Sequence, residues 1–299
     1  MPPTPDLHRE PMPPIQPDTD QIGLRRRALE IILRHKDADL IVATGILCDI
    51  NPERAEEFLN EIVRIDPASP DREKTKALDR ILDHYSPHTL GHSRMARDLV
   101  RRLNARKHGT PLRFLRLGAL ARAMETHDYG KLGMPDSTLN MPHDKGYSPR
   151  ELYEKERHPL LGQALLKYLQ FHDEMAPRIA LTHHLRYKTV DGRPELSGYP
   201  IEDFKKYCDS NNLEPVLTPE DHLAAFVDVY TAATDPNRPT KLHKSNKPGM
   251  SDTEKVRTAL EEMDGYFEDD FYQKGEGAPL YKAFKEAMMA DAYPVDLAA

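Results

Sequence analysis

Tryptophan is absent from this 299-residue sequence, and cysteine occurs only twice, as Cys48 and Cys208. Two cysteines cannot make the disulfide framework of a small secreted protein, so a reducing compartment is the simpler interpretation. No apolar run is long enough to span a bilayer. The first 20 residues are rich in proline and acidic side chains and lack the apolar segment of a signal peptide. We therefore expect a cytoplasmic protein with no membrane span.

An excess of positive charge is also missing. Lys and Arg number 42 against 49 Asp and Glu, the net charge is -7 and the pI is about 6.1. This balance argues against nucleic-acid polymers and anionic membranes as dedicated partners, although it allows a local basic pocket. Hydrophobic residues make up 38% of the chain, enough to bury a globular core.

Helical periodicity runs through most of the chain, beginning at Leu24. Helix starts are expected at Asn51-Pro52 and at Ser69-Pro70, and Ser251 with Glu254 has the pattern of a capping box. Further helices are expected at about 88–107, 111–127, 173–186, 219–234 and 279–290.

Two interruptions of this helical pattern are expected. Proline disfavours helical geometry in the residue before it, so a break between two helices is expected at His158-Pro159. No alternating run of β-branched residues stands out, and about 187–217 is expected to be a long irregular stretch of the kind that often carries function. The predicted fold class is all-α.

Histidine is abundant, with 14 residues. His88 and His92 are spaced i, i+4 and so project from one helix face, where they could chelate one metal. His127-Asp128 ends the next predicted helix. In chain order the candidate metal ligands are His88, His92, His127, Asp128, His158, His183, His184 and Asp228. Imidazole with carboxylate suits iron, manganese, nickel or zinc, and a bridging carboxylate suits two ions about 3.5–4 Å apart.

Each candidate also has a plainer explanation. A single buried histidine is usually a hydrogen-bonded core residue. Asp228 lies in the apolar segment HLAAFVDVYTAAT and could be a buried carboxylate bound to an arginine or to the backbone. The ordered set favours a metal site, because its members (His, His-Asp, His, His-His and Asp) each lie on a helix of their own. The other histidines are interpreted as surface or structural residues: His8, His35, His84, His108, His143, His172, His222 and His243.

Five motifs in order resemble the HD-GYP family of metal-dependent phosphodiesterases, a branch of the HD-domain phosphohydrolases. "THDYGKLGMPDSTLN" is similar to the family's HD-x-G-K core, and "KERHPLLGQALL" to its H-P-x-x-G helix. "HHLRYKTVDGRPELSGYP" contains its His-His, Asp-Gly and Gly-Tyr-Pro elements. "FVDVYTAATDPNRPTK" resembles its last metal aspartate and the Arg-Pro-x-Lys step that follows. The resemblance covers roughly residues 84–245 and implies a helical bundle with a metal cluster between the helices.

The resemblance also implies roles. Asp128 would bridge two metals, Lys131 would neutralise charge near the scissile phosphate, and Tyr199 would close over the site or pack beneath it. Arg238 and Lys241 would hold phosphate oxygens. The implied cofactors are two or three divalent ions, iron or manganese first, with zinc or nickel as alternatives, and the implied reaction is attack of a metal-bound hydroxide on the phosphodiester.

The sequence departs from the family pattern at several positions. His88 stands where members with three metals have glutamate, which leaves two or three ions open. Leu185 replaces a glutamate after His-His, and Thr231 replaces an aspartate. The segment between His-His and Gly-Tyr-Pro is longer than the family's. The substrate is therefore less closely defined than the reaction.

The chain is divided into a tail that is disordered or loosely docked (1–20), an N-terminal helical region (21–85) and an HD-GYP-like phosphodiesterase domain (86–295). The expected substrate is cyclic di-GMP or a related cyclic dinucleotide. The alternatives are an HD phosphohydrolase acting on another nucleotide phosphoester and a weakly active cyclic-dinucleotide receptor. A protein partner would be expected to contact the N-terminal region or the Gly-Tyr-Pro loop, and the sequence leaves the oligomeric state open.

Overall fold

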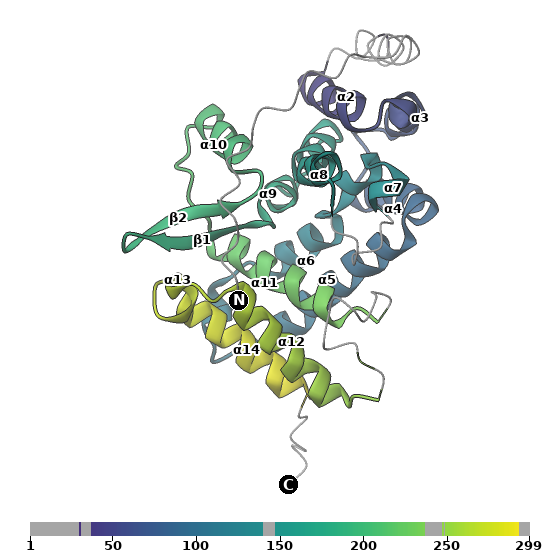
Figure 1. Ribbon diagram of the computed structural model, residues 1–299. Coiled ribbons are helices and arrows are strands. Elements are labelled where there is room, and N and C mark those ends of the chain that lie inside the picture. The colour runs from purple at the N-terminus through teal and green to yellow at the C-terminus, as the bar shows by residue number, and fades with distance from the viewer. Residues whose placement is uncertain (1–29, 31–36, 140–146, 237–246, 248, 293–299) are drawn as a thin grey trace.

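The computed structural model describes residues 30, 37–139, 147–236, 247 and 249–292, and these residues are mostly helical (Figure 1). The helices in chain order are α2 (Ala38–Ile50), α3 (Pro52–Ile62), α4 (Asp71–Tyr85), α5 (Pro87–Arg106), the 3-10 turn η1 (Pro111–Phe114), α6 (Leu117–Thr126), the 3-10 turn η2 (Tyr129–Gly133), α7 (Asp136–Leu139), α8 (Pro149–Tyr168), α9 (Met175–Thr182), α10 (Ile201–Ser210), α11 (Pro219–Thr234), α12 (Asp252–Tyr266), α13 (Asp270–Gln273) and α14 (Ala278–Ala292). None of them is both long and apolar enough to cross a membrane. The all-α prediction is confirmed.

Local capping explains where several helices begin. Ser251 and Glu254 make the predicted capping box at α12, in which each side chain satisfies a backbone N–H of the other residue. Asn51 and Pro52 start α3 as predicted, although the Asn51 side chain makes no cap hydrogen bond. The start predicted at Ser69 is wrong by one residue, because Pro70 is the cap of α4.

The predicted helix break at His158-Pro159 is wrong. α8 is one helix of 20 residues that runs through Pro159 without a break. The preference of a pre-proline residue for extended backbone is a modest local term, and it is outweighed here by packing, because α8 lies against α2, α9 and η2. Much of the helix is buried, including Leu161, Leu165 and Leu166.

The predicted irregular stretch at 187–217 is also wrong. Strands β1 (Leu185–Val190) and β2 (Arg193–Gly198) form an antiparallel hairpin, and α10 follows directly. The turn residues Asp191 and Gly192 have φ of 48° and 75°, the left-handed backbone that a two-residue hairpin turn requires. An Asp-Gly step of this kind is itself a hairpin signal. The predicted helix at 173–186 ends at Thr182 for the same reason, since the next residues lead into β1.

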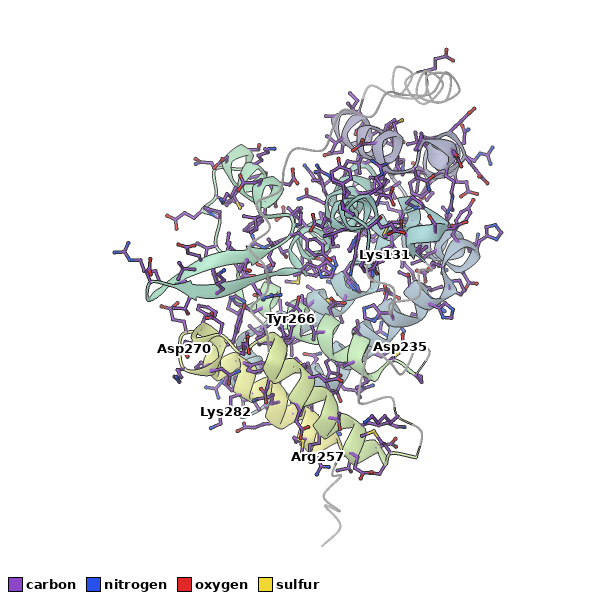
Figure 2. All side chains as sticks on the ribbon, viewed as in Figure 1. Lys131, Asp235, Arg257, Tyr266, Asp270 and Lys282 are labelled. Carbon is purple, nitrogen blue, oxygen red and sulfur yellow. The ribbon has the colours of Figure 1, made fainter. Side chains whose placement is uncertain are left out.

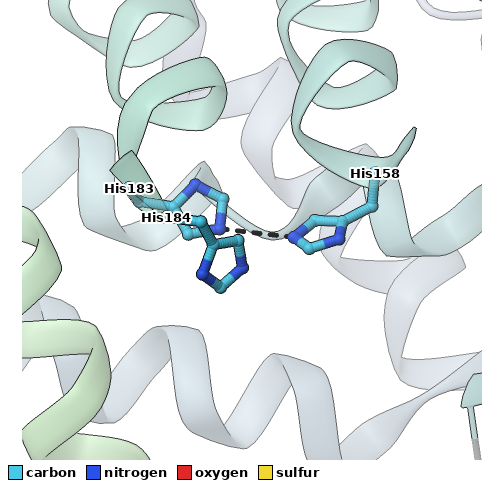
Figure 3. A group of neighbouring side chains, drawn as sticks. All are labelled: His158, His183 and His184. Atoms are coloured by element: carbon cyan, nitrogen blue, oxygen red, sulfur yellow. Dashed lines mark hydrogen bonds between the residues drawn. The ribbon is translucent and has the colours of Figure 1, made fainter. Parts of the chain in front are cut away.

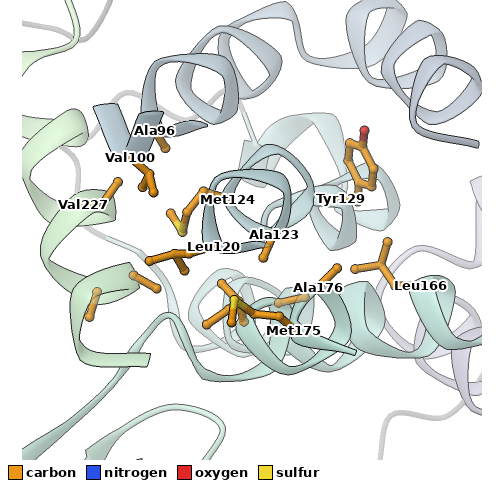
Figure 4. Packing of buried hydrophobic residues seen from close by; sticks show 14 of the residues in the cluster. Ala96, Val100, Leu120, Ala123, Met124, Tyr129, Leu166, Met175, Ala176 and Val227 are labelled. Atoms are coloured by element: carbon orange, nitrogen blue, oxygen red, sulfur yellow. The ribbon is translucent and has the colours of Figure 1, made fainter. Parts of the chain in front are cut away.

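The main hydrophobic core is continuous from Leu40 of α2 to Met288 of α14. Figure 4 shows its centre, where Val100 and Ala96 of α5, Leu120 of α6 and Val227 of α11 converge. α5 and α6 have the most extensive mutual packing of any helix pair in the described part of the chain. The same helices supply candidate ligands, so burial of their apolar faces fixes the site. The division of the chain at residue 85 stays a prediction.

A smaller core anchors the hairpin. Leu185 of β1 packs with Leu181, Phe204 of α10, Cys208 and Leu217, and all five are buried. The hairpin is therefore held at its base, directly after His183 and His184.

Candidate metal centre

Seven of the predicted ligands converge between the helices. They come from α5, the ends of α6 and α9, η2, α8 and α11, and they are His92, His127, Asp128, His158, His183, His184 and Asp228. They form three overlapping groups of possible metal ligands, and in each group the donor atoms lie within 4.8 Å of one another. His127 and His183 each belong to two groups, so the three groups form one continuous cluster.

Asp128 lies between two sets of histidines. Its Oδ1 is 3.4 Å from Nε2 of His158 and 3.6 Å from Nε2 of His183. Its Oδ2 is 3.4 Å from Nε2 of His127 and 3.9 Å from Nε2 of His92. A carboxylate whose two oxygens face different donor sets has the arrangement that could bridge two ions.

Asp228 closes the cluster from α11. Its Oδ1 accepts a hydrogen bond from Nε2 of His92 at 2.8 Å and lies 3.5 Å from Nε2 of His127. Its Oδ2 lies 3.7 Å from Nδ1 of His184. The contacts of this buried carboxylate in the described residues are with imidazoles, as the ligand hypothesis expects, rather than with the arginine or backbone of the alternative explanation.

Backbone carbonyls orient three of the rings. Nδ1–H of His127 donates to Met124 O at 2.7 Å, and Nδ1–H of His183 donates to Ala180 O at 3.0 Å. Both carbonyls lie in the last turn of a helix, where they have no partner within the helix. Because Nδ1 carries the proton, Nε2 has a bare lone pair that points into the cluster, the usual arrangement of a metal-binding histidine.

His158 obtains the same orientation in the middle of α8. Its Nδ1–H donates to Lys155 O at 2.6 Å. In a regular helix that carbonyl would accept from the N–H of residue 159, but Pro159 has no N–H. The proline thus leaves a carbonyl for the histidine ring, which gives the His-Pro pair a physical function.

We expect Pro159→Ala to stabilise α8 but weaken metal binding. The new N–H would compete for Lys155 O, so the His158 ring would be less well fixed. Removing a proline from a helix interior can contribute up to about 3 kcal/mol, whereas loss of a ligand's outer partner costs about 10- to 100-fold in metal affinity. Thermal unfolding of the metal-free protein and a metal titration measure the two effects. Pro149→Ala, at the first position of the same helix, is the control and should change neither; unchanged metal affinity in Pro159→Ala would contradict the account.

Several of the donor atoms lack the hydrogen-bond partners that buried polar atoms usually have, as expected of atoms that bind a metal. His127 Nε2, Asp128 Oδ1 and His184 Nε2 are buried and have no hydrogen-bond partner, although buried polar atoms are nearly always paired. Nε2 of His158 lies 3.3 Å from Nε2 of His183 (Figure 3). When both rings donate through Nδ1, these two nitrogens are acceptors and need a proton or a cation between them.

The electrostatics keep His158, Asp128 and Asp228 in their ligand forms. Burial lowers the pKa of His158 to about 4, so its ring is neutral near pH 7. Burial raises the pKa of Asp128, but Lys131 and His127 lower it by more, and the result is well below the usual value. The pKa of Asp228 is also lowered well below its usual value, by His127 and His92 against the effect of burial. Neutral imidazoles and ionised carboxylates are the forms that bind metal.

Lys131 and Tyr199 border the cluster. Lys131 Nζ donates to Asp128 Oδ2 at 2.6 Å, and its side chain is 16% exposed, so it reaches the outer side of the site. The Tyr199 ring lies 4.6 Å from the His184 ring, centroid to centroid. The Gly-Tyr-Pro segment that ends the hairpin thus packs against a candidate ligand.

Other predicted site residues lie elsewhere. His88 is exposed and belongs to none of the three groups, so the structure does not bring it into the cluster. Arg238 and Lys241 lie outside the described residues. Leu185, at the family's glutamate position, is fully buried in the small core, and Thr231 turns its hydroxyl back to Val227 O at 2.7 Å. The orienting carbonyls were missed from the sequence, although the proline after His158 was a usable signal for one of them.

Comparison with known proteins supports the fold. Residues 76–200 match the family model described as HD domain, a span that includes every predicted ligand from His88 to His184. Two solved structures of the L. monocytogenes phosphodiesterase PgpH HD domain are similar in shape. One is 17% identical, with a TM-score of 0.46, and covers 72% of this chain and 96% of that one. The other, in complex with cyclic-di-AMP, is 16% identical, with a TM-score of 0.47, and covers 72% and 95%. No curated protein matches the chain.

Proposed function

We propose that this chain, which carries an HD domain over residues 76–200, is a metal-dependent phosphodiesterase that hydrolyses cyclic di-GMP or a related cyclic dinucleotide. The observation that carries the proposal is the position of Asp128, whose two oxygens face His158 and His183 on one side and His92 and His127 on the other. The resemblance of five ordered motifs to HD-GYP enzymes supports the substrate class.

The residues would hold two ions, because His127 and His183 each belong to two groups of donors and the two oxygens of Asp128 face different histidines. This mixture of imidazole and carboxylate suits iron, manganese, nickel or zinc, and iron or manganese is proposed first because of the resemblance to HD-GYP enzymes. Bound metals would supply an activated water and neutralise charge on the phosphoryl oxygens. The chain itself keeps Asp128 ionised through Lys131 and fixes the rings through backbone carbonyls.

Substrate binding is proposed for the residues at the rim. Lys131 has its ammonium group on the outer side of Asp128, where it could move to a phosphate oxygen and give a charge-assisted hydrogen bond. Tyr199 offers an aromatic face beside His184. Arg238 and Lys241 stay proposed phosphate ligands on the basis of the sequence alone.

A substrate panel tests this proposal. Metal-loaded protein would be incubated with cyclic di-GMP, hybrid cyclic GMP-AMP, an aryl phosphodiester and an aryl phosphomonoester, and products would be separated by chromatography. We expect cleavage of the diesters, fastest for a dinucleotide. Cleavage of the monoester alone would indicate another HD phosphohydrolase, and tight binding of a dinucleotide without turnover would indicate a receptor.

A further inference from the structure

Arg186 and Tyr266 form a pair beside the metal centre. Arg186 is two residues beyond His184 on β1, and Tyr266 is the last residue of α12. The Arg186 Cζ lies 4.3 Å from the centroid of the Tyr266 ring, so the guanidinium is stacked on it. α11, which carries Asp228, packs against both β1 and α12. In Figure 2 Tyr266 lies between the hairpin and these helices.

Strand geometry directs Arg186 away from the protein core. Successive side chains of a strand point to opposite faces. Leu185 packs into the small core, and Tyr187 packs on Phe271 with ring centroids 4.8 Å apart. Arg186 lies between them in sequence and so projects from the opposite face, where it meets Tyr266. Tyr187 is therefore used in packing.

The pair lies close enough to the cluster to share its electrostatics. Burial raises the pKa of Tyr266, Arg186 lowers it, and the Asp228 carboxylate raises it again. Burial raises the pKa of Tyr199 well above its usual value, and Tyr266 and Asp228 add to that effect. Two stacked pairs of side chains therefore lie near the metal centre: Tyr199 with His184, whose ring centroids are 4.6 Å apart, and Arg186 with Tyr266.

Arg186 differs from nearby arginines in its partners. Arg178 is paired with Asp221 at 2.7 Å, and Arg157 with Asp203 at 3.4 Å. Within the described part of the chain Arg186 forms no salt bridge. Its guanidinium instead stacks on the ring of Tyr266, a residue that is 41% exposed. The N–H groups at the edge of a stacked guanidinium stay available to a ligand.

The chemistry of this edge matches one nucleobase. An arginine fork can donate two parallel hydrogen bonds to O6 and N7 of guanine, whereas adenine presents a donor, its amino group, in place of O6. Tyr266 holds the guanidinium plane in place, and the Tyr199 ring beside His184 is a second aromatic surface near the metal centre. Such stacking faces are sequence-tolerant, so discrimination between bases would come from Arg186.

We propose that Arg186, oriented by Tyr266, is the specificity-determining residue that recognises a guanine base of the substrate. This inference rests on the proposed function, because it assumes that a phosphodiester of a cyclic dinucleotide is held at the metals. It makes cyclic di-GMP the preferred substrate over cyclic di-AMP.

The test compares kcat/KM for cyclic di-GMP and cyclic di-AMP in wild type, Arg186→Ala and Arg186→Lys, all loaded with metal. Wild type should prefer cyclic di-GMP. Both variants should lower the ratio of the two kcat/KM values by about ten- to a hundredfold, since lysine keeps the charge but not the fork. Lys188→Ala, two residues further along the same strand, is the matched control and should leave the ratio at the wild-type value.

Three results would overturn the inference. These are no guanine preference in wild type, an unchanged ratio in Arg186→Ala, and equal losses on both dinucleotides, which would indicate a phosphate contact or a structural role. Metal content and thermal unfolding of each variant exclude misfolding as the cause. If wild type cleaves no phosphodiester, the proposed function fails. The inference about Arg186 is then tested by equilibrium binding, as the ratio of the affinities for cyclic di-GMP and cyclic di-AMP in wild type and in Arg186→Ala.

Discussion

Asp128→Ala protein should lose both bound metal and phosphodiester hydrolysis. The two oxygens of Asp128 face separate sets of histidines, so its removal would take a ligand from both of the proposed ions at once. Loss of a residue that only orients a ligand already costs about 10- to 100-fold in metal affinity or activity, and we expect a larger loss here. Metal content by mass spectrometry and hydrolysis of cyclic di-GMP measure the two losses.

His222→Gln is the matched control for this experiment. His222 is also buried, but it bonds to the Tyr272 hydroxyl at 3.1 Å and belongs to none of the three groups of donors. This variant should keep its metal. Asp128→Asn, which preserves the shape of the side chain, separates loss of charge from loss of volume and should also be depleted of metal. Full metal content and activity in Asp128→Ala would show that the cluster is assigned wrongly.

Gly130→Ala should prevent α8 from reaching its place. A Cβ at residue 130 would lie 1.8 Å from His158 O and 2.6 Å from Gly162 N, both backbone atoms of α8. Backbone atoms cannot rotate away as a side chain can, so the helix itself would have to move. We expect a loss of more than about 4 kcal/mol in the free energy of unfolding, measured by urea denaturation, and with it a loss of metal, because α8 carries His158.

Two other glycines show whether contact is the cause. Gly162→Ala would place its Cβ 3.2 Å from Gly130 N, a milder conflict, and should destabilise the protein less. Gly91→Ala lies on α5 next to His92, with no atom within 4 Å of the new Cβ. Alanine is the better helix former, so this variant should gain up to about 1 kcal/mol. Equal stability of Gly130→Ala and Gly91→Ala would refute the packing explanation.

The sequence could predict the helices and most members of the candidate metal centre because both depend on local pattern. Capping signals such as Ser251 with Glu254 involve residues within one helical turn, so they can be recognised in a short stretch of sequence. The seven side chains that converge could be picked out because histidines and aspartates recur in a recognisable order, one set per helix. Their convergence, in contrast, depends on packing of α5, α6, α8 and α11 around the shared core, which the resemblance implied and local pattern alone could not supply.

The errors have a common origin in tertiary contacts. The preference of the residue before Pro159 predicted a break, but burial of α8 kept the helix intact. His88 shares a helix face with His92 by spacing, yet it is exposed while His92 is 2% exposed. Spacing along one helix does not show which of the two positions neighbouring elements cover. The pairing of Arg186 with Tyr266 joins residues 80 positions apart, and nothing local indicates it.

Titration of metal into chelator-treated protein, followed by hydrolysis of cyclic di-GMP at each step, tests the central claim most directly. The number of ions bound per chain would be measured in the same samples, under anaerobic conditions with iron or manganese. The account predicts no hydrolysis without metal and activity that rises as the second ion binds. Hydrolysis by the metal-free protein, or no hydrolysis of any phosphodiester with two ions bound, would contradict it.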